Sequence, residues 1–283
     1  MRIYVVGAGR AGTALARLCA EAGHDVLGLC CRSAASAPMA ALAEVPVHVG
    51  ANIPPSVDWV WLTVPDRALE DTARSLWTSG ALSDRVVLAH ASGAEPAHIL
   101  RQGAPGVRAV VSLHPLQSLA RDARTGPLRA ATFTAEGESA GVAAARELLA
   151  PLGKELMVIT ACAKPLYHAA AVLASNALVA LADAAVEALV SAGVDRDRAL
   201  EALLPLMEGT LGNLRATGLP GALTGPASRG DAATVAAHVA ALGAAPGVLP
   251  LYRALSERIV QVAAQGGTPP EALAAVSAAL DAP

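Results

Sequence analysis

One stretch of this sequence carries a narrow stripe of polar side chains whose types suit proton transfer. Lys164 and His168 stand four residues apart in a run made otherwise mostly of Ala, Leu and Val. On a helix of about 100° per residue, Ser175 falls within about 40° of them, and Asn176 lies about 80° to one side of His168. Such a stripe on an apolar helix predicts a wet cleft. The alternatives are a solvated helix face or core polar groups that are satisfied locally.

Two further polar side chains follow predicted strands. A strand over residues 86–89 precedes Ser92, and a strand over residues 109–113 precedes His114. The carboxyl ends of parallel strands meet at one edge of a sheet, which is where ligands bind. We therefore expect Ser92 and His114 to lie together at that edge. Either one alone could instead be a helix cap or a loop hydrogen bond.

The elements that position these groups begin with a glycine loop, Gly7-Ala8-Gly9-Arg10-Ala11-Gly12. It lies between an apolar strand over residues 3–6 and a helix that begins near residue 13. In that context the first glycine permits a tight turn, the second lets backbone N–H groups approach a pyrophosphate, and the third lets helix and strand pack closely. The helix N-terminus would face the anion. The loop thus predicts a bound dinucleotide, the alternative being a glycine-rich turn without a ligand.

The end of the next strand, over residues 25–31, bears on which dinucleotide is bound. Sites that prefer NAD usually place Asp or Glu here to bond the ribose 2′-hydroxyl, but the sequence has no acidic residue over positions 26–43. Arg32, Ser33 and Ser36 could instead hold a 2′-phosphate. We therefore predict NADP rather than NAD, the alternative being a solvated Arg32. Further cofactor contacts, mainly through shape and backbone, are expected from Thr63, Val64 and Pro65.

Periodicity divides the chain into two parts. Apolar runs typical of buried strands alternate with helices up to about residue 160, and only helical periods follow. We predict an α/β, Rossmann-type N-terminal domain with a parallel sheet over residues 1–160. An all-α C-terminal domain over residues 161–283 is expected to serve substrate binding and dimerisation. Local expectations are Asp66 as the N-cap of a helix over 66–77, one helix over 164–192, and a helix end at 218–221.

A loop rich in Gly and Pro, residues 223–231, has two interpretations. Asp231 is well placed to cap the helix that follows it, and that alone would explain the residue. Thr224, Ser228 and Arg229 remain in a loop with a fixed backbone, where an arginine suits a carboxylate or a phosphate. The candidate substrate-binding residues are Ser175, Thr224, Arg229 and Asp231.

Composition narrows the class of protein. The formal net charge is −3, aromatic residues make up 2%, and no basic run occurs, so a nucleic-acid partner is disfavoured. The four cysteines form no C-x-x-C pair and the histidines are scattered, so no metal site is predicted. The Ala-rich stretch over residues 169–190 is long enough for a membrane span, but Ser175, Asn176, Asp183 and Glu187 favour a soluble helix. We expect a cytoplasmic protein.

The motifs together resemble those of the Rossmann-like proteins that carry the DUF2520 domain, a family often described as candidate oxidoreductases. The resemblance covers nearly the whole chain. Beyond the glycine loop it rests on His90-Ala91-Ser92-Gly93-Ala94, His114-Pro115-Leu116-Gln117-Ser118, Tyr167-His168-Ala169-Ala170-Ala171 with Ser175-Asn176, and Leu223-Thr224-Gly225-Pro226 with Arg229-Gly230-Asp231.

In plan the chain is similar to ketopantoate reductases, pyrroline-5-carboxylate reductases, β-hydroxyacid dehydrogenases and prephenate dehydrogenases. Ser92 and His114-Pro115 resemble the serine and His-Pro elements of the prephenate dehydrogenases. The ketopantoate reductases and β-hydroxyacid dehydrogenases use a Lys and an Asn four residues apart on the first long helix of the second domain. Here Lys164 is followed at that step by His168, and an asparagine comes only at Asn176.

The resemblance implies an NADP-dependent oxidoreductase that transfers hydride to a small carbonyl or imine acid, a ketopantoate-like 2-oxo acid being marginally favoured. His168 is the first candidate for the general acid and Lys164 the second. Asn176 and Ser92 would orient the substrate, and His114 would line the nicotinamide side. Two alternatives stay open: a non-catalytic NADP-binding sensor or scaffold, and a reductase that uses a deazaflavin on the same fold. The Ala-rich helices of the second domain favour a homodimer.

Overall fold

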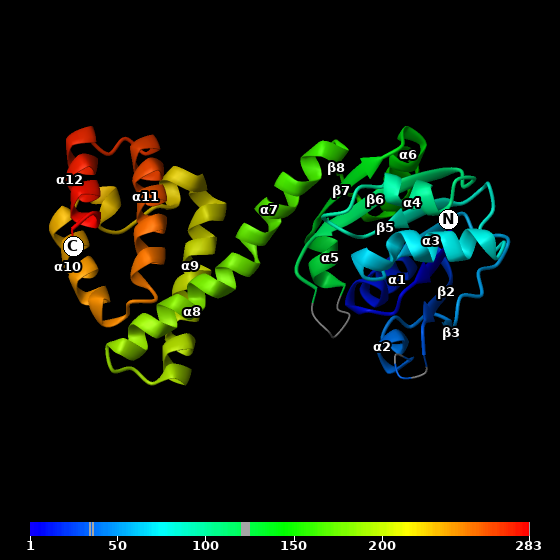
Figure 1. Cartoon of the computed structure of the whole chain (residues 1–283), viewed down its shortest axis with the longest axis horizontal. Helices are drawn as coiled ribbons and strands as arrows, with labels where there is room; N and C mark the ends of the chain where they lie inside the picture. The colour runs from blue at the N-terminus through cyan, green and yellow to red at the C-terminus, as the bar shows by residue number, and fades with distance from the viewer. Residues whose placement is uncertain (34, 36, 120–124, 283) are drawn as a thin grey trace. The chain divides into compact units, whose positions relative to one another are not determined.

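A computed structural model describes residues 1–33, 35, 37–119 and 125–282 of the chain. Within them, eight strands form one sheet in the spatial order β3-β2-β1-β4-β5-β6-β7-β8 (Figure 1). Neighbouring strands are parallel except β6 and β7, which are antiparallel. The predicted Rossmann-type sheet is therefore confirmed, with β7 and β8 running opposite to the other six described strands. The strands are β1 (Arg2–Val6), β2 (Asp25–Cys31), β3 (Val47–Val49), β4 (Trp59–Leu62), β5 (Val87–His90), β6 (Ala109–Leu116), β7 (Thr132–Gly137) and β8 (Leu156–Val158).

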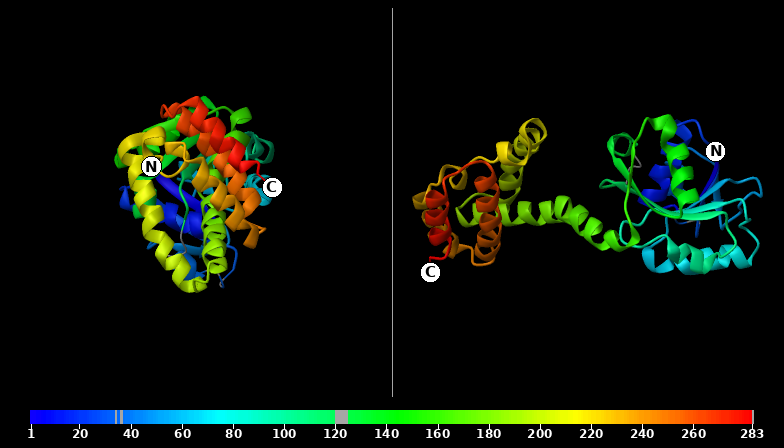
Figure 2. Two further views of the ribbon diagram at one scale, coloured as in Figure 1. Left: turned by 90° about the vertical axis from the view of Figure 1, so that its left-hand side faces the viewer. Right: turned by 90° about the horizontal axis from the view of Figure 1, so that it is seen from above.

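Helices cover both faces of this sheet (Figure 2). Strand β4 shows why, since Trp59 and Trp61 enter one apolar core and Val60 and Leu62 enter the other. A strand buried on both faces reads as a continuous apolar run, as this one does. The helices on the first face include α1 (Arg10–Glu21) and α6 (Ser139–Leu149), and those on the second are α3 (Leu69–Thr78) and α4 (His98–Gly103).

The strand order reverses between β1 and β4, which are neighbours near the middle of the sheet. In open α/β sheets the ligand crevice lies outside the carboxyl ends of the strands at such a point. The glycine loop follows β1, Thr63 follows β4, Ser92 follows β5 and His114 lies near the end of β6. The sheet therefore gathers these sequence-predicted residues along one edge.

By compactness, the chain divides into residues 1–173 and residues 174–283. We expected the helical part to begin at residue 161, but α7 (Lys164–Ala174) lies almost wholly in the first unit, because its first turns bind the strand ends. The single helix expected over residues 164–192 is wrong. The chain breaks at Ser175, with φ −126° and ψ −72°, and α8 (Asn176–Ser191) begins after it.

The break also bears on the apolar stretch over residues 161–191. By length and composition this stretch would pass for a membrane span, and 6% of its most apolar window is buried. It consists, however, of η4 (Ala161–Ala163), α7 and α8 rather than one continuous helix.

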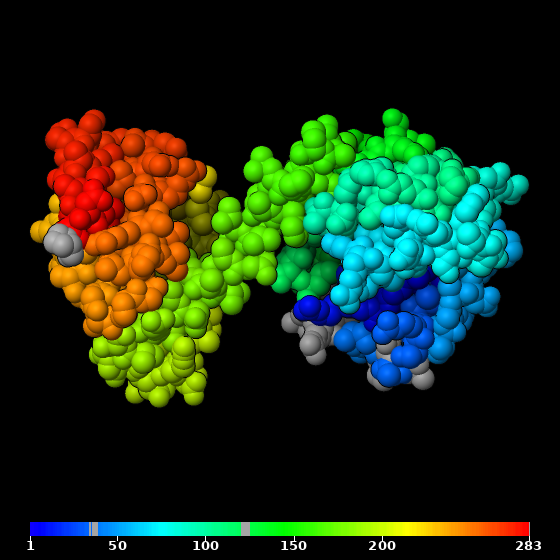
Figure 3. All heavy atoms as spheres, viewed as in Figure 1, coloured from blue at the N-terminus to red at the C-terminus, as the bar shows by residue number. Residues whose placement is uncertain are grey.

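In its described residues the second unit is helical throughout, as predicted. Its core is small and centres on Val235, Val239, Val276 and Leu280 from α10 and α12. Figure 3 shows α11 and α12, in orange and red, packed side by side. The helix end expected at residues 218–221 is confirmed at Gly218, where φ +73° and ψ −175° are not helical, so α9 consists of two helices that meet at a kink. The helices after α8 are α9 (Arg196–Ala222), α10 (Ala232–Ala241), α11 (Leu249–Gln265) and α12 (Pro270–Leu280).

Candidate active site

The three glycines of the glycine loop have different structural reasons. Gly7 has φ +118°, which favours glycine, and a Cβ there would lie 2.8 Å from the Thr63 backbone. A Cβ at Gly12 would lie 1.9 Å from the Gly7 oxygen, so α1 packs this closely only with glycine at that position. A Cβ at Gly9 would meet nothing within 4 Å. Neither the turn nor the packing therefore requires glycine at position 9. A ligand that approaches the backbone closely would require it, because a side chain would keep the ligand away.

The first turn of α1 leaves its backbone donors available. Gly9 is the N-cap and has no side-chain oxygen, and the first turn holds no acidic residue. The first helical hydrogen bond runs from Thr13 N–H to the Gly9 carbonyl at 3.0 Å. From the other side, the Thr63 hydroxyl holds the loop by donating to the Gly7 carbonyl at 2.7 Å. Helix N-termini of this kind bind anions, so the loop fits the pyrophosphate of a dinucleotide.

The residues expected to select the dinucleotide lie beside this loop. Arg32 and Ser33 follow β2 directly, and both are exposed. The Gly7 N–H donates to the Cys30 carbonyl at 3.0 Å, which ties the end of β2 to the glycine loop. Ser36 lies outside the described residues.

The segment after β4 links the glycine loop to the next strand end. Val64 is half-buried and Pro65 is exposed. Asp66 does not cap the helix that follows, which corrects our expectation, since neither η2 (Asp66–Ala68) nor α3 has a side-chain cap. Its Oδ2 instead accepts a hydrogen bond from Ser92 Oγ at 2.9 Å. A partner on the neighbouring strand end, distant in sequence, outcompetes the local cap.

Ser92 lies in a turn after β5, where its hydroxyl makes three hydrogen bonds. The hydroxyl donates to Asp66 and accepts from the N–H groups of Ala94 at 3.2 Å and Glu95 at 3.0 Å. A serine hydroxyl has one donor and two acceptor sites. In this conformation all three are engaged, so the hydroxyl shapes the turn, and its role in orienting a substrate stays a prediction.

Lys164, at the start of α7, is buried against the ends of β5 and β6, with 2% of its surface exposed. Its Nζ donates to Ser112 Oγ at 2.6 Å and to the Ser92 carbonyl at 3.1 Å. The Ser112 hydroxyl also donates to that carbonyl, at 3.1 Å. Burial lowers the pKa of Lys164 to about 8, although nearby carboxylates, Glu136 first among them, oppose the shift. Such a lysine is still charged at neutral pH but releases its proton more readily than an exposed one.

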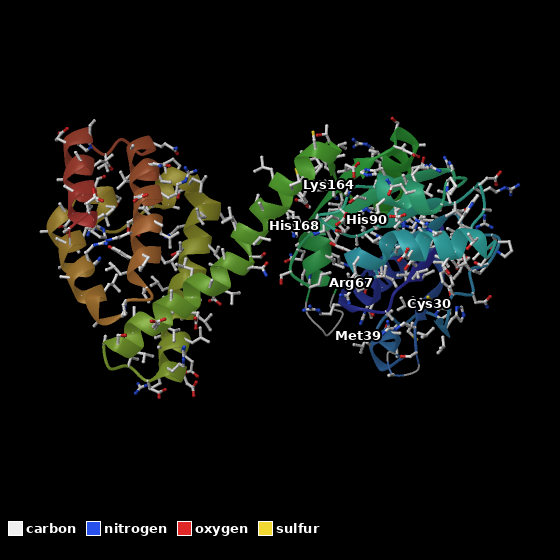
Figure 4. The ribbon with its side chains drawn as sticks, in the orientation of Figure 1. Cys30, Met39, Arg67, His90, Lys164 and His168 are labelled. Carbon is white, nitrogen blue, oxygen red and sulfur yellow. The ribbon has the colours of Figure 1, made fainter. Side chains whose placement is uncertain are left out.

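Gly93 marks the place where two histidines approach the turn. A Cβ at this glycine would lie 2.9 Å from His168 Nδ1 and 3.1 Å from His114 Nε2. Within the described part of the chain, His168 Nδ1 is buried without a hydrogen-bond partner. Burial lowers the pKa of His114 to about 4, and the charges of Lys164 and His168 add to this shift. Figure 4 shows Lys164 and His168 on α7 and His90 on the sheet beside them.

Sequence reasoning did not assign roles to Ser112 and Tyr167. Ser112 is fully buried inside the apolar strand β6, where a serine gives no chemical signal until its partner is known. Tyr167 Oη lies 2.6 Å from His114 Nδ1. Because Tyr167 stands three residues after Lys164, helical spacing places both on one face, and this signal was available in the sequence.

The remaining predicted residues lie in the second unit. Ser175 Oγ donates to Asn176 Oδ1 at 3.0 Å at the break between α7 and α8. Thr224 and Arg229 are exposed. Asp231 caps α10 by accepting from the N–H three residues further on at 3.0 Å, so the predicted cap is confirmed. The roles of these residues toward a substrate stay predictions.

Family comparisons match both parts of the chain. Residues 1–115 match the model of a Rossmann-like domain, and residues 131–259 match DUF2520, a domain of unknown function. The chain therefore contains a Rossmann-like domain followed by a DUF2520 domain. The resemblance inferred from the motifs is thereby confirmed. No curated protein matches this DUF2520 protein significantly.

Solved structures share the fold of this DUF2520 protein over nearly its whole length. A protein from Thermotoga maritima is 25% identical with a TM-score of 0.72, over 93% of this chain and 98% of that one. A candidate NADP oxidoreductase from Bacteroides fragilis is 21% identical with a TM-score of 0.73, over 92% and 98%. A 1-pyrroline-5-carboxylate reductase from Streptococcus pyogenes is 15% identical with a TM-score of 0.61, over 98% of each chain.

Proposed function

We propose that this protein is an NADP-dependent oxidoreductase that transfers hydride to a small carbonyl or imine acid, a ketopantoate-like 2-oxo acid being the first substrate to test. The observation that carries the proposal is the convergence of Lys164, His168 and His114 along the strand edge that also bears the glycine loop. The fold is shared with a pyrroline-5-carboxylate reductase and an imine reductase, whose activities support this reaction class.

In this proposal, side chains of the protein stabilise the negative charge that develops on the substrate and supply the proton that neutralises it. Hydride addition to a carbonyl carbon leaves negative charge on the oxygen, which a positioned donor must neutralise. A reduced nicotinamide supplies the hydride when it is bound. His168 is the proton donor in this proposal, because its ring meets the turn at Gly93 with Nδ1, which has no hydrogen-bond partner among the described residues. The Lys164 ammonium, fixed by Ser112, polarises the oxygen electrostatically.

NADP is preferred over NAD in this proposal because of the chemistry at the end of β2. Arg32 and Ser33 are exposed there, and no carboxylate follows the strand to bond a ribose hydroxyl. A Plasmodium falciparum pyrroline carboxylate reductase of the same fold, 12% identical with a TM-score of 0.59, has been solved with NADP bound.

A panel of small 2-oxo acids and cyclic imines tests the proposal. Each is mixed with NADPH, NADH or reduced deazaflavin, and the absorbance of the reduced cofactor is followed. We expect NADPH to be consumed with at least one acid, and His168→Ala to lower turnover about 10²–10⁴-fold. His98→Ala, at an exposed histidine of α4, is the matched control and should keep full turnover. No consumption with any pair would favour a nucleotide-binding sensor, and consumption of deazaflavin alone would replace the cofactor.

We also propose that the second unit mediates a homodimer of a cytoplasmic protein. Helices α8, α9 and α11 line an apolar cavity of about 910 Å³, and Leu206 and Leu219 on α9 are 66% and 68% exposed. Extended apolar patches on soluble proteins mark protein contacts, and a second copy presents the same helices. All four cysteines are free, which suits a reducing compartment. Sedimentation should give a dimer that Leu219→Asp dissociates, and a wild-type monomer at all concentrations would refute the dimer.

A further inference from the structure

Tyr167 has no part in the proton-transfer scheme above, but it touches one of the histidines in that scheme. Its Oη lies 2.6 Å from His114 Nδ1, and the two rings meet edge to face with centroids 5.6 Å apart. His114 belongs to β6 and Tyr167 to α7. The contact therefore joins the strand edge to the helix that carries Lys164 and His168.

The direction of this hydrogen bond follows from the charge states of the two rings. His114 is neutral at pH 7, because burial lowers its pKa to about 4. Burial raises the pKa of Tyr167, so the phenol keeps its proton. A phenol hydroxyl is a stronger hydrogen-bond donor than a neutral imidazole N–H, and a bare imidazole nitrogen is a stronger acceptor than a phenol oxygen, so the Tyr167 hydroxyl donates to Nδ1.

We propose that Tyr167 is a positioning residue that holds neutral His114 in the tautomer with its proton on Nε2. A neutral imidazole has one N–H, so a ring that accepts at Nδ1 must donate at Nε2. Nε2 is the atom that a Cβ at Gly93 would meet at 3.1 Å, and His168 Nδ1 approaches the same point at 2.9 Å. His114 thus offers a fixed N–H donor, rather than a base, on the side of the ring where His168 lies.

A neutral donor suits the charges around His114. The titratable groups described around this ring include Lys164, His168 and His90, and a positive charge on any of them disfavours an imidazolium at His114. A neutral N–H can hydrogen-bond to a developing oxyanion without adding a second cation beside Lys164. The action on a substrate rests on the proposed function, whereas the tautomer rests on the contacts of the chain alone.

The tautomer can be measured without substrate or cofactor. In ¹⁵N-labelled protein, the shifts and two-bond couplings of the ring nitrogens distinguish a protonated nitrogen from a bare one, and His114→Gln assigns the signal. We expect a bare Nδ1 and a protonated Nε2, unchanged between about pH 6 and pH 8. Tyr167→Phe should give a mixture of both tautomers. A protonated Nδ1 in the wild-type protein, a ring that becomes charged in that range, or a Tyr167→Phe spectrum identical to wild type would overturn the proposal.

The second unit contains a matched control pair. Tyr252 Oη lies 2.9 Å from His238 Nδ1, with the rings again edge to face, in an exposed setting. Tyr252→Phe removes the same hydroxyl and should leave the His114 spectrum unchanged. This variant separates the effect of the Tyr167 hydrogen bond from any general consequence of a Tyr→Phe change.

Kinetics then test what the tautomer does. With an active substrate, Tyr167→Phe should lower kcat about tenfold and change KM by less than about twofold, the effect of one orienting hydrogen bond. Tyr252→Phe should change neither. An unchanged kcat in a variant with mixed tautomers would refute the donor role of His114. If the wild-type protein turns over no substrate, the proposed function fails, while the spectrum still decides whether Tyr167 sets the tautomer.

Discussion

Two polar regions that the sequence singles out have opposite characters in the structure. Around Lys164, side chains from the ends of β4, β5 and β6 meet the start of α7, and their hydrogen bonds join residues far apart in sequence. In the loop over residues 223–231 the bonds are local, as when Ser228 Oγ donates to the Gly225 carbonyl at 2.8 Å. The first region is buried and built by the whole unit, whereas the second is built by its own few residues.

This difference suggests that the first region serves catalysis and the second serves the local backbone structure. Burying the Lys164 ammonium costs folding free energy that its hydrogen bonds and the neighbouring carboxylates offset only in part, as its lowered pKa records. Titratable groups held under such conditions cluster at functional sites. Nothing comparable is buried in the loop, where Arg229 is exposed and Asp231 caps a helix. We therefore expect substitutions in the first region to affect turnover and those in the second to affect stability.

The largest effect is expected at Gly93. In Gly93→Ala the new Cβ would lie 2.9 Å from His168 Nδ1 and 3.1 Å from His114 Nε2, so both rings must shift. A misplacement of about 1 Å can cost about 10²-fold in rate, and kcat/KM should fall by about that factor. Steady-state kinetics on the substrate found in the panel measures it.

Gly209→Ala is the matched control for this change. A Cβ at this glycine of α9 meets nothing within 4 Å, and alanine is the better helix former by about 1 kcal/mol. Its activity should match wild type, and a cooperative thermal melt should show that Gly93→Ala is folded. If folded Gly93→Ala keeps full turnover, the positions of the His114 and His168 rings do not affect catalysis. The expected functional difference between the region around Lys164 and the loop over residues 223–231 would then be wrong.

The second effect is the pH dependence that Lys164 imposes. Its pKa is about 8, so the polarising charge is lost above that pH and kcat/KM should fall about tenfold per pH unit. Lys164→Met should give a lower rate without this alkaline limb. Lys154→Met, at a half-buried lysine away from the described contacts of Lys164, should keep the limb. An identical limb in Lys164→Met would assign it to another group.

The titration of Lys164 should also change the free energy of unfolding with pH, in a direction that follows from its lowered pKa. The folded pKa of about 8 lies below the ordinary 10.5, so the unfolded chain binds more protons between these values. The free energy of unfolding contributed by Lys164 is therefore constant below about pH 8, rises from there to about pH 10.5 by about 3 kcal/mol, and is constant beyond. The difference between wild-type and Lys164→Met chemical denaturation across this range isolates it from other titrations.

These contrasts also explain how far the sequence could be interpreted. The sheet was predictable because runs such as residues 59–62 must be buried on both faces, and the glycine loop because its spacing has a steric cause. Asp66 was wrongly predicted as a cap because its partner, Ser92, belongs to another strand end. Ser112 gave no signal inside an apolar strand, and the break at Ser175 has no Gly or Pro to announce it. Long-range partners decide these cases, and local patterns do not contain them.

The smallest effect tests the loop in the second unit. Asp231→Ala removes the carboxylate that accepts the N–H at the start of α10, and the loss of such a cap costs about 1 kcal/mol. Asp195 caps α9 in the same way, so Asp195→Ala should cost a similar amount and serves as the matched variant. Chemical denaturation measures both, and turnover should stay at the wild-type level. If Asp231→Ala raised KM while Asp195→Ala did not, the loop over residues 223–231 would bind substrate. The loss of a helix cap alone should affect both variants in the same way, so it could not explain a change in KM in only one of them.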